Sequence, residues 1–231
     1  MSYGRRGLNL SNFLSAGRTR TLSTAENSVG TFLILAVCTG NVCRSPAVER
    51  LLARDLGPTV FVSSAGTHAL VGQPIAEPMA RLLRDHGVEP GAFTARRLTE
   101  TLVKDADLIL ALTRAQRSLA VEAWPPAVRR TFTVREFARL LNKLDSFALP
   151  DGTPAERLRA AMPLAAAQRG LRPASAQDDD VIDPFRLSDD VYAASFAEIT
   201  SAGNVIVRAL GISDAPRNQP ARESDWRLGR D

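Results

Sequence analysis

The chain has 231 residues, of which 45% are hydrophobic and 23% charged, the balance of an ordinary globular protein with one sizeable core. No apolar run approaches the roughly 20 residues that a transmembrane helix needs, so the composition excludes a membrane span and predicts no membrane partner. The formal net charge is +4, but the basic residues are scattered along the chain. The charge therefore weakly favours anionic substrates and predicts no nucleic-acid partner.

The two cysteines, Cys38 and Cys43, lie close together in the sequence. Their spacing fits neither a secreted disulfide framework nor a zinc site, so we expect a reducing cytoplasm and no metal. Arg5 and Arg6 suggest twin-arginine export as an alternative. The residues that follow them are too polar for a signal peptide, which disfavours that alternative.

The first predicted element is a strand at Thr31–Val37, an apolar run typical of the centre of a parallel sheet covered on both faces. After a short loop, Ser45-Pro46 fits the N-cap and first turn of a helix at Ala47–Leu56. The remaining predicted elements are a strand at Thr59–Val62, a helix at Ile75–His86 ended by Gly87, a strand at Asp107–Leu112, a strand at Arg130–Val134 that runs into a helix at Arg135–Leu144, and a helix at Asp189–Leu210. This alternation predicts a doubly wound α/β fold.

The predicted domain spans residues 30–212, between a disordered basic tail at 1–28 and a loose tail at 213–231. Residues 145–177 are rich in Ala and Arg and show no obvious strand, so we interpret them as an insertion with a helix at Pro154–Gln168. A lid, a docking surface and inert decoration all stay open as roles for it. Its position just before an acidic loop favours a role in substrate choice.

Cys38 lies between the buried strand and the start of the next helix, where backbone N–H groups converge and the helix dipole favours an anion. The ionised form of a thiol is stabilised there, and Ser45 can donate to it, so Cys38 is predicted to be a nucleophile at neutral pH. Arg44 can curl back across the loop and hold two phosphoryl oxygens with its planar guanidinium. In an Arg-rich chain, a Cys followed six residues later by an Arg is weak evidence for such a site. Gly40, Asn41 in a left-handed turn and the preceding strand strengthen this evidence.

Transfer of a phosphoryl group to a thiolate also needs a proton for the departing oxygen, and a carboxyl on a loop is the usual donor. Asp183 in Asp183-Pro184-Phe185 is the candidate. Pro184 favours an extended conformation at Asp183, and Phe185 offers a flat wall for an aromatic leaving group. Asp178, Asp179 and Asp180 are expected to raise the proton affinity of Asp183.

The stretch Val37–Pro46 resembles the low-molecular-weight protein tyrosine phosphatase signature, and Asp183-Pro184-Phe185 resembles the acid motif of that family. Further similar stretches are Ser63–Thr67 after the second strand, Ala95–Leu98 and Ala106–Leu112. The resemblance covers about Phe32–Gly211 apart from the insertion. The scarcity of Lys beside many Arg suggests a bacterial source.

The resemblance implies a four-stranded parallel sheet of order 2-1-3-4 with the site at the carboxyl end of the first strand. It implies hydrolysis of phosphotyrosine in proteins, without a cofactor and with inorganic phosphate as product, by a monomer or weak dimer. Cys38 would form a phosphocysteine, Arg44 would clamp the phosphate, and Asp183 would act as general acid and then as general base. The implied substrate contacts are Thr39, Gly40, Asn41, Val42, Cys43, Ser45 and Phe185, and Asn41 and Ser64 would hold the loop in shape.

The resemblance also implies that Cys43 traps an oxidised Cys38 as a disulfide, although a buried hydrophobic role for Cys43 is an equal alternative. Arg186 replaces a second aromatic residue of many relatives, which weakens the tyrosine assignment. Val42 stands where the phosphoarginine phosphatases of the family look to carry Thr, which disfavours phosphoarginine. Two further functions stay open: an arsenate reductase that uses an external small thiol, since no cysteine follows Cys43, and a phosphoprotein-binding module without turnover.

Overall fold

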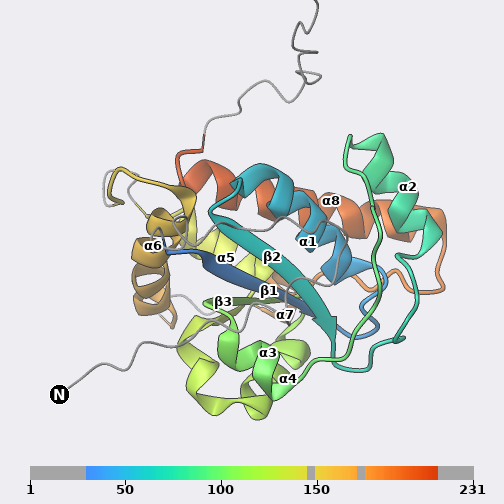
Figure 1. Ribbon diagram of the computed structural model, residues 1–231, viewed down its shortest axis with the longest axis horizontal. Helices are drawn as coiled ribbons and strands as arrows, with labels where there is room; N and C mark the ends of the chain where they lie inside the picture. The colour runs from blue at the N-terminus through green and yellow to red at the C-terminus, as the bar shows by residue number, and fades with distance from the viewer. Residues whose placement is uncertain (1–29, 145–148, 171–174, 213–231) are drawn as a thin grey trace, which may run out of the picture.

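The computed structural model describes residues 30–144, 149–170 and 175–212, so both predicted tails lie outside the described residues. A parallel sheet of four strands forms the centre of the molecule (Figure 1). Its strands are β1 (Phe32–Cys38), β2 (Val60–Gly66), β3 (Leu108–Ala111) and β4 (Thr131–Thr133), in the order β2-β1-β3-β4. The predicted fold class and strand order are confirmed.

Strand β1 is a central strand of the sheet, and every one of its residues is buried. Ile34 and Ala36 point into the larger of two hydrophobic clusters, whereas Leu35 and Val37 point into the smaller one. This alternation follows from the two-residue repeat of a strand, with one cluster on each face of the sheet. Because β1 pairs with both β2 and β3, its end is held firmly in place, and that end is Cys38.

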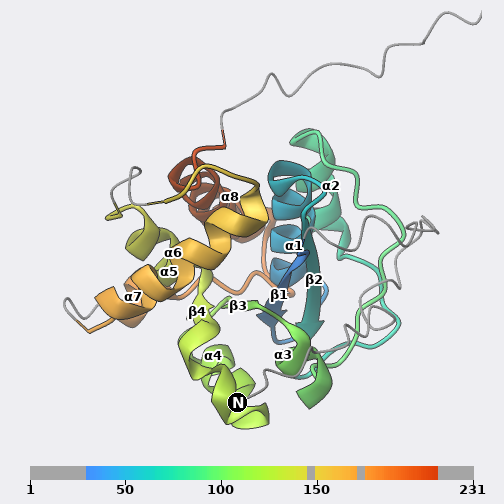
Figure 2. The ribbon, with the colours of Figure 1, turned by 60° about the vertical axis from the view of Figure 1, so that its left-hand side comes forward.

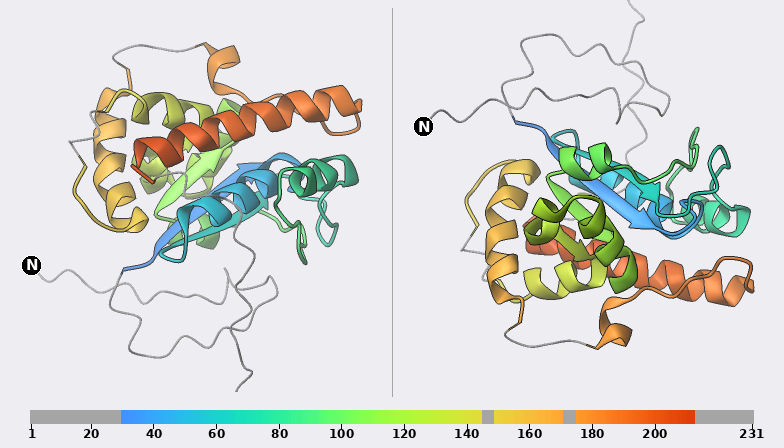
Figure 3. Two further views of the ribbon diagram at one scale, coloured as in Figure 1. Left: turned by 90° about the horizontal axis from the view of Figure 1, so that it is seen from above. Right: turned by 90° about the horizontal axis from the view of Figure 1, so that it is seen from below.

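Helices cover both faces of the sheet. On one face lie α1 (Arg44–Leu56), α5 (Val134–Leu141) and α8 (Asp189–Ala209), with α2 (Glu77–Asp85) beside α1 and α8 (Figure 3, left). On the other face lie α3 (Glu100–Asp105), α4 (Arg114–Ala123) and the 3-10 helix η3 (Pro125–Arg130) (Figure 3, right). Within the described residues, no helix combines the length and the hydropathy that crossing a bilayer requires.

The first helix differs from its prediction at the start. Helix α1 begins at Arg44, with Cys43 as the N-cap residue and no capping side chain. Ser45 is therefore not the N-cap, and its hydroxyl instead contacts the Cys38 thiol. Strand β2 also continues to Gly66, so Ser63–Gly66 belongs to the strand rather than following it.

The sequence analysis did not predict four helical segments in the described part of the chain: α3, α4, η3 and the short helix α7 (Ala176–Asp179). Helix α3 begins after Thr99, whose side chain accepts a hydrogen bond from Leu102 N, and α4 begins after Thr113, which accepts one from Gln116 N. Both are Thr N-caps that the sequence displays. They were missed because α3 is short and α4 buries only Gln116 and Ala120, so neither shows a strong apolar repeat.

The helix predicted inside residues 145–177 is confirmed as α6 (Pro154–Gln168), and a capping box at Thr153 starts it. Helix α6 packs beside α5 and against β1 (Figure 2). Arg159 donates to the carbonyl of Thr31, and Arg169, just after the helix, donates to the carbonyl of Thr131. These contacts lie at the amino end of the strands, opposite Cys38, so α6 is not placed to act as a lid.

Candidate active site

The loop after β1 wraps around the Cys38 sulfur. Cys38 is 2% exposed, and its Sγ accepts a hydrogen bond from Asn41 N at 3.2 Å and lies 2.9 Å from Ser45 Oγ. Asn41 has a φ of 56°, which turns the backbone N–H inward. These contacts place the sulfur at the centre of the loop, with a backbone N–H directed at it.

Side chains behind the loop hold it in this shape. Asn41 Nδ2 donates to Ser45 Oγ at 3.0 Å and to Ser64 Oγ at 2.8 Å, while Asn41 Oδ1 accepts from Arg96 N at 2.8 Å. Ser64 Oγ in turn donates to Glu49 Oε2 at 2.6 Å. The bracing contacts expected for Asn41 and Ser64 are thus present, and they extend to a buried carboxyl that the sequence analysis did not single out.

Burial raises the pKa of Glu49 above its ordinary value of 4.5, outweighing the hydrogen bond from Ser64. A carboxyl of this kind stabilises the fold fully below its unfolded pKa and loses that contribution as pH rises through its folded pKa. Glu49→Gln keeps an acceptor for Ser64 and does not titrate. We expect the melting temperature of Glu49→Gln, measured by thermal unfolding, to rise relative to that of the wild type as the pH increases above 4.5, the ordinary pKa of the carboxyl. A difference that is constant with pH would contradict this prediction.

Arg44 and Asp183 meet at the mouth of the loop. Arg44 is 2% exposed; its Nη1 donates to the carbonyl of Val181 at 3.2 Å and its Nη2 forms an ion pair with Asp183 Oδ2. Arg44 Nε is buried and has no partner among the described residues. A buried donor without an acceptor is costly, and an anion bound over the loop would supply one.

The segment before Asp183 is fixed by three other side chains. Ile182 N donates to Glu198 Oε2 at 3.0 Å, and Ser195 Oγ donates to the carbonyl of Ile182 at 2.9 Å. Arg135 Nη1 donates to the carbonyl of Asp180 at 2.9 Å and to Glu198 Oε1 at 3.1 Å. Helices α5 and α8 thus position Asp183 from behind, a role that the sequence alone did not indicate.

The acidic neighbours of Asp183 point elsewhere. Asp178 Oδ2 accepts from Ser175, Asp179 forms ion pairs with Arg114 and Arg139, and Asp180 Oδ1 accepts from the backbone N–H of Arg114. Each of these carboxylates is engaged by a cation or a donor of its own, and their effect on the proton affinity of Asp183 stays a prediction. Among the described residues, His, Cys, Asp and Glu side chains form no cluster of three that would hold a metal ion.

A cavity of about 120 Å³ opens above Cys38. Phe185, 38% exposed, and Leu70 stand on its wall. Arg186 has a φ of 63°, and its guanidinium carbon lies 5.1 Å from the centre of the Phe185 ring, so a cation replaces the second aromatic side chain. The cavity lining includes most of the predicted contacts: Cys38, Thr39, Gly40, Val42, Cys43, Arg44, Asp183 and Phe185.

Two residues that support the loop were missed. A Cβ on Gly66 would collide with the carbonyl oxygen of Thr39, so only glycine lets β2 approach the loop this closely. Gln116, 5% exposed, donates from Nε2 to Thr39 Oγ1 at 3.0 Å. The Gly at the carboxyl end of β2 was a visible signal for the first, whereas nothing in the local sequence links Gln116 to Thr39.

Cys43 lies behind the loop, 3% exposed, with its sulfur 3.4 Å from Tyr192 Oη. Burial raises the pKa of the Cys43 thiol to about 11, and the contact with Tyr192 offsets only part of this effect. Both cysteines are free thiols. Cys43 is therefore overwhelmingly protonated at neutral pH.

Comparison with known proteins follows this geometry. The family described as low molecular weight phosphotyrosine protein phosphatase matches residues 33–152. The chain is 45% identical over 96 residues to the low molecular weight protein-tyrosine-phosphatase Etp of Escherichia coli K12, which covers 42% of this chain and 64% of that protein. The chain thus spans just under two thirds of the length of this relative.

Two further similarities reach over more of the chain. A protein-arginine-phosphatase of Geobacillus stearothermophilus is 35% identical over 130 residues, covering 56% of this chain and 86% of that protein. A crystal structure of the tyrosine phosphatase AmsI of Erwinia amylovora aligns with a TM-score of 0.57 and 26% identity over 78% of this chain and 93% of that chain.

Proposed function

Because the chain belongs to the low molecular weight phosphotyrosine protein phosphatase family, we propose that it hydrolyses phosphotyrosine in cytoplasmic proteins and acts as a monomer or weak dimer. One observation carries the proposal: Cys38, the last residue of β1, and Arg44, the first residue of α1, flank the same short loop, and the Arg44 Nε has no partner among the described residues. A nucleophile and a free donor for an anion are what transfer of a phosphoryl group to sulfur requires.

The proposed reaction has two steps. The phosphate binds over the loop, and Arg44 exchanges its contact with Asp183 for phosphoryl oxygens. The Cys38 thiolate attacks phosphorus, the bond to the phenolic oxygen breaks, and Asp183 gives that oxygen a proton. In the second step Asp183 takes a proton from water, and the oxygen of this water attacks the phosphorus of the phosphocysteine. The bond between sulfur and phosphorus breaks, inorganic phosphate leaves, and the Cys38 thiolate is regenerated.

Two pocket residues support tyrosine as the phosphorylated side chain. Val42 is apolar and lines the cavity, and the ring of Phe185 stands at its wall, so both offer apolar contacts to an aromatic group. Phosphoarginine is nevertheless the natural competing substrate, because one relative is named a protein-arginine-phosphatase. The named relatives are phosphatases, so arsenate reduction is not favoured.

The direct test is hydrolysis of p-nitrophenyl phosphate, a phosphotyrosine peptide and a phosphoarginine peptide in the presence of a chelator. We expect turnover of the first two, with kcat/KM for the phosphotyrosine peptide at least about tenfold above that for the phosphoarginine peptide. Arsenate-dependent oxidation of a small thiol is measured beside it. Absence of turnover of both p-nitrophenyl phosphate and the phosphotyrosine peptide would refute the proposal.

We further propose that Cys43 protects Cys38 during oxidation. Peroxide converts the Cys38 thiolate to a sulfenic acid; the Cys43 sulfur then attacks it, a disulfide forms and water leaves. Because the attacking species is the thiolate and the Cys43 pKa is about 11, this step accelerates roughly tenfold per pH unit near neutrality.

The Cys43→Ser variant tests this role. After peroxide and then dithiothreitol, we expect the wild type to regain most of its starting activity and Cys43→Ser to regain much less of its own. The gap between the two proteins should widen from pH 7 to pH 9, since more Cys43 is ionised at higher pH. Equal recovery of both proteins at every pH would assign Cys43 a purely packing role.

A further inference from the structure

A second cavity lies beside the catalytic pocket. Its volume is about 730 Å³, and it shares Thr39, Arg44, His68 and Asp183 with the pocket above Cys38. Cavities that bind small ligands measure roughly 300 to 1,000 Å³, so this one has room for a group well beyond a phosphate. A substrate held by its phosphate in the catalytic pocket therefore has an adjoining space into which a neighbouring part can extend.

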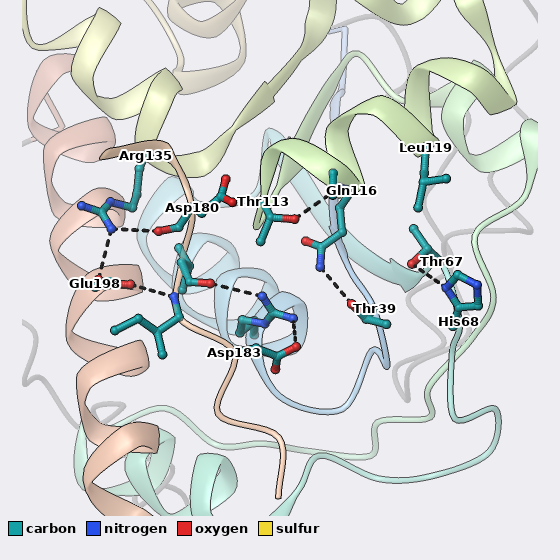
Figure 4. A pocket seen from close by; sticks show the side chains of 14 residues that line it. Thr39, Thr67, His68, Thr113, Gln116, Leu119, Arg135, Asp180, Asp183 and Glu198 are labelled. Atoms are coloured by element: carbon teal, nitrogen blue, oxygen red, sulfur yellow. Dashed lines mark hydrogen bonds and ion pairs between the residues drawn. The ribbon is translucent and has the colours of Figure 1, made fainter. Parts of the chain in front are cut away.

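The walls of this cavity come from distant parts of the chain. Figure 4 shows Arg135, Asp180 and Glu198 at one end, Leu119, Thr67 and His68 at the other, and Gln116 and Thr39 between them. Gln116 joins the cavity wall to the catalytic loop, since it donates to Thr39. The cavity is thus built onto the same rigid frame that holds the site.

The charged side chains of the cavity already have partners within the protein. Arg135 is paired with Glu198, and the other Glu198 oxygen accepts from Ile182 N. Asp180 Oδ1 accepts from the backbone N–H of Arg114 at 2.7 Å. Binding a charged group here would compete with these contacts, so the cavity is not arranged to select a charged residue.

Apolar side chains in the cavity, by contrast, remain exposed. Leu119 on α4 is 39% exposed, and Ile182 beside the catalytic acid is 46% exposed. Ile182 is held through its N–H by Glu198 and through its carbonyl by Ser195, so its exposed side chain is a fixed part of the wall. Removing such surface from water is favourable, which makes an apolar group the ligand that fits.

From these contacts we infer that the cavity binds a bulky apolar side chain next to the phosphotyrosine of the substrate. The inference rests on the proposed phosphatase activity and names its substrate class: proteins in which a residue such as Leu, Ile or Phe flanks the phosphorylated tyrosine. Continuity with the catalytic pocket selects this occupant, because a flanking residue is the part of a bound substrate that reaches the adjoining space. Arg44, which lines both cavities, holds the phosphate and leaves the flank to the apolar wall.

The test compares two peptides that differ only at the residues on both sides of phosphotyrosine, Leu in one and Ser in the other. We expect the wild type to prefer the Leu peptide by about tenfold in kcat/KM, the scale of small apolar contacts in enzyme pockets. Leu119→Ser removes apolar wall, and Ala115→Trp fills the cavity from α4. Both should bring the ratio between the two peptides close to one.

Val128→Ser is the matched control, because Val128 is an apolar side chain with 51% exposure on η3, at the amino end of the sheet. It should keep the wild-type ratio. A ratio near one in the wild type, or a wild-type ratio in both Leu119→Ser and Ala115→Trp, would overturn the inference. Failure of the phosphatase proposal is a separate result, since p-nitrophenyl phosphate has no flanking residue and its turnover reports the chemistry alone.

Discussion

Replacement of Cys38 by Ser is expected to lower kcat for p-nitrophenyl phosphate by a factor of about 10³ or more, because the variant loses the nucleophile. The hydroxyl of Ser stays protonated at neutral pH. The described contacts of the Cys38 sulfur are Asn41 N and Ser45 Oγ, and neither is a base that could activate a hydroxyl in its place. Donors that stabilise a sulfur anion do not make an alkoxide accessible. Steady-state kinetics with single-turnover trapping of the phosphoenzyme checks the expectation.

The same variant should still bind phosphate. Serine is close in size to cysteine, and Arg44 with its unpartnered Nε is untouched, so inorganic phosphate should protect the variant against thermal unfolding as it does the wild type. Lost turnover with retained phosphate binding separates loss of chemistry from loss of the fold. Turnover within tenfold of the wild type would show that Cys38 is not the nucleophile.

The sequence predicted the sheet and the catalytic loop because both depend on local patterns. The apolar run that became β1 admits few alternatives, and the loop residues between Cys38 and Ser45 are contiguous. The turn at Asn41 was also predictable, since Asn tolerates a left-handed backbone. Local chemistry in one stretch of chain is what sequence reasoning treats best.

The supporting contacts were not predictable for the opposite reason. Gln116 reaches Thr39, and Glu198 holds Ile182, only because the fold brings distant segments together. The partners of Asp179 were equally hidden, since Arg114 and Arg139, which form ion pairs with it, lie far from it in the sequence. Contacts of this kind join polar side chains that are distant in the sequence, and a single sequence does not show which of them will meet.

Replacement of Asp183 by Asn is expected to slow hydrolysis of phenyl phosphate by roughly 10²- to 10⁴-fold, the usual range for loss of a general acid. Asn is similar in shape and can still accept from Phe185 N, which Asp183 Oδ1 does at 3.3 Å. It has no proton to give the departing phenolate. Hydrolysis of p-nitrophenyl phosphate should slow much less, because p-nitrophenolate leaves readily without one.

Asp189→Asn is the control for this comparison, since it also removes an exposed carboxylate, the partner of Arg81, but at the start of α8 and outside the acid loop. It should slow neither substrate. Equal slowing of both substrates by Asp183→Asn would mean that Asp183 positions other groups and does not deliver the proton.

The ion pair between Arg44 and Asp183 adds a second consequence for Asp183→Asn. In the structure Arg44 Nη2 is engaged by Asp183, so an incoming phosphate has to displace that contact before the guanidinium can clamp it. Removing the negative charge weakens the competitor, and the inhibition constant of inorganic phosphate should therefore fall while kcat also falls. If Asp183 only supported the fold, Asp183→Asn would disorder the loop and bind phosphate more weakly. The inhibition constant of phosphate therefore shows whether Asp183 competes with phosphate for Arg44.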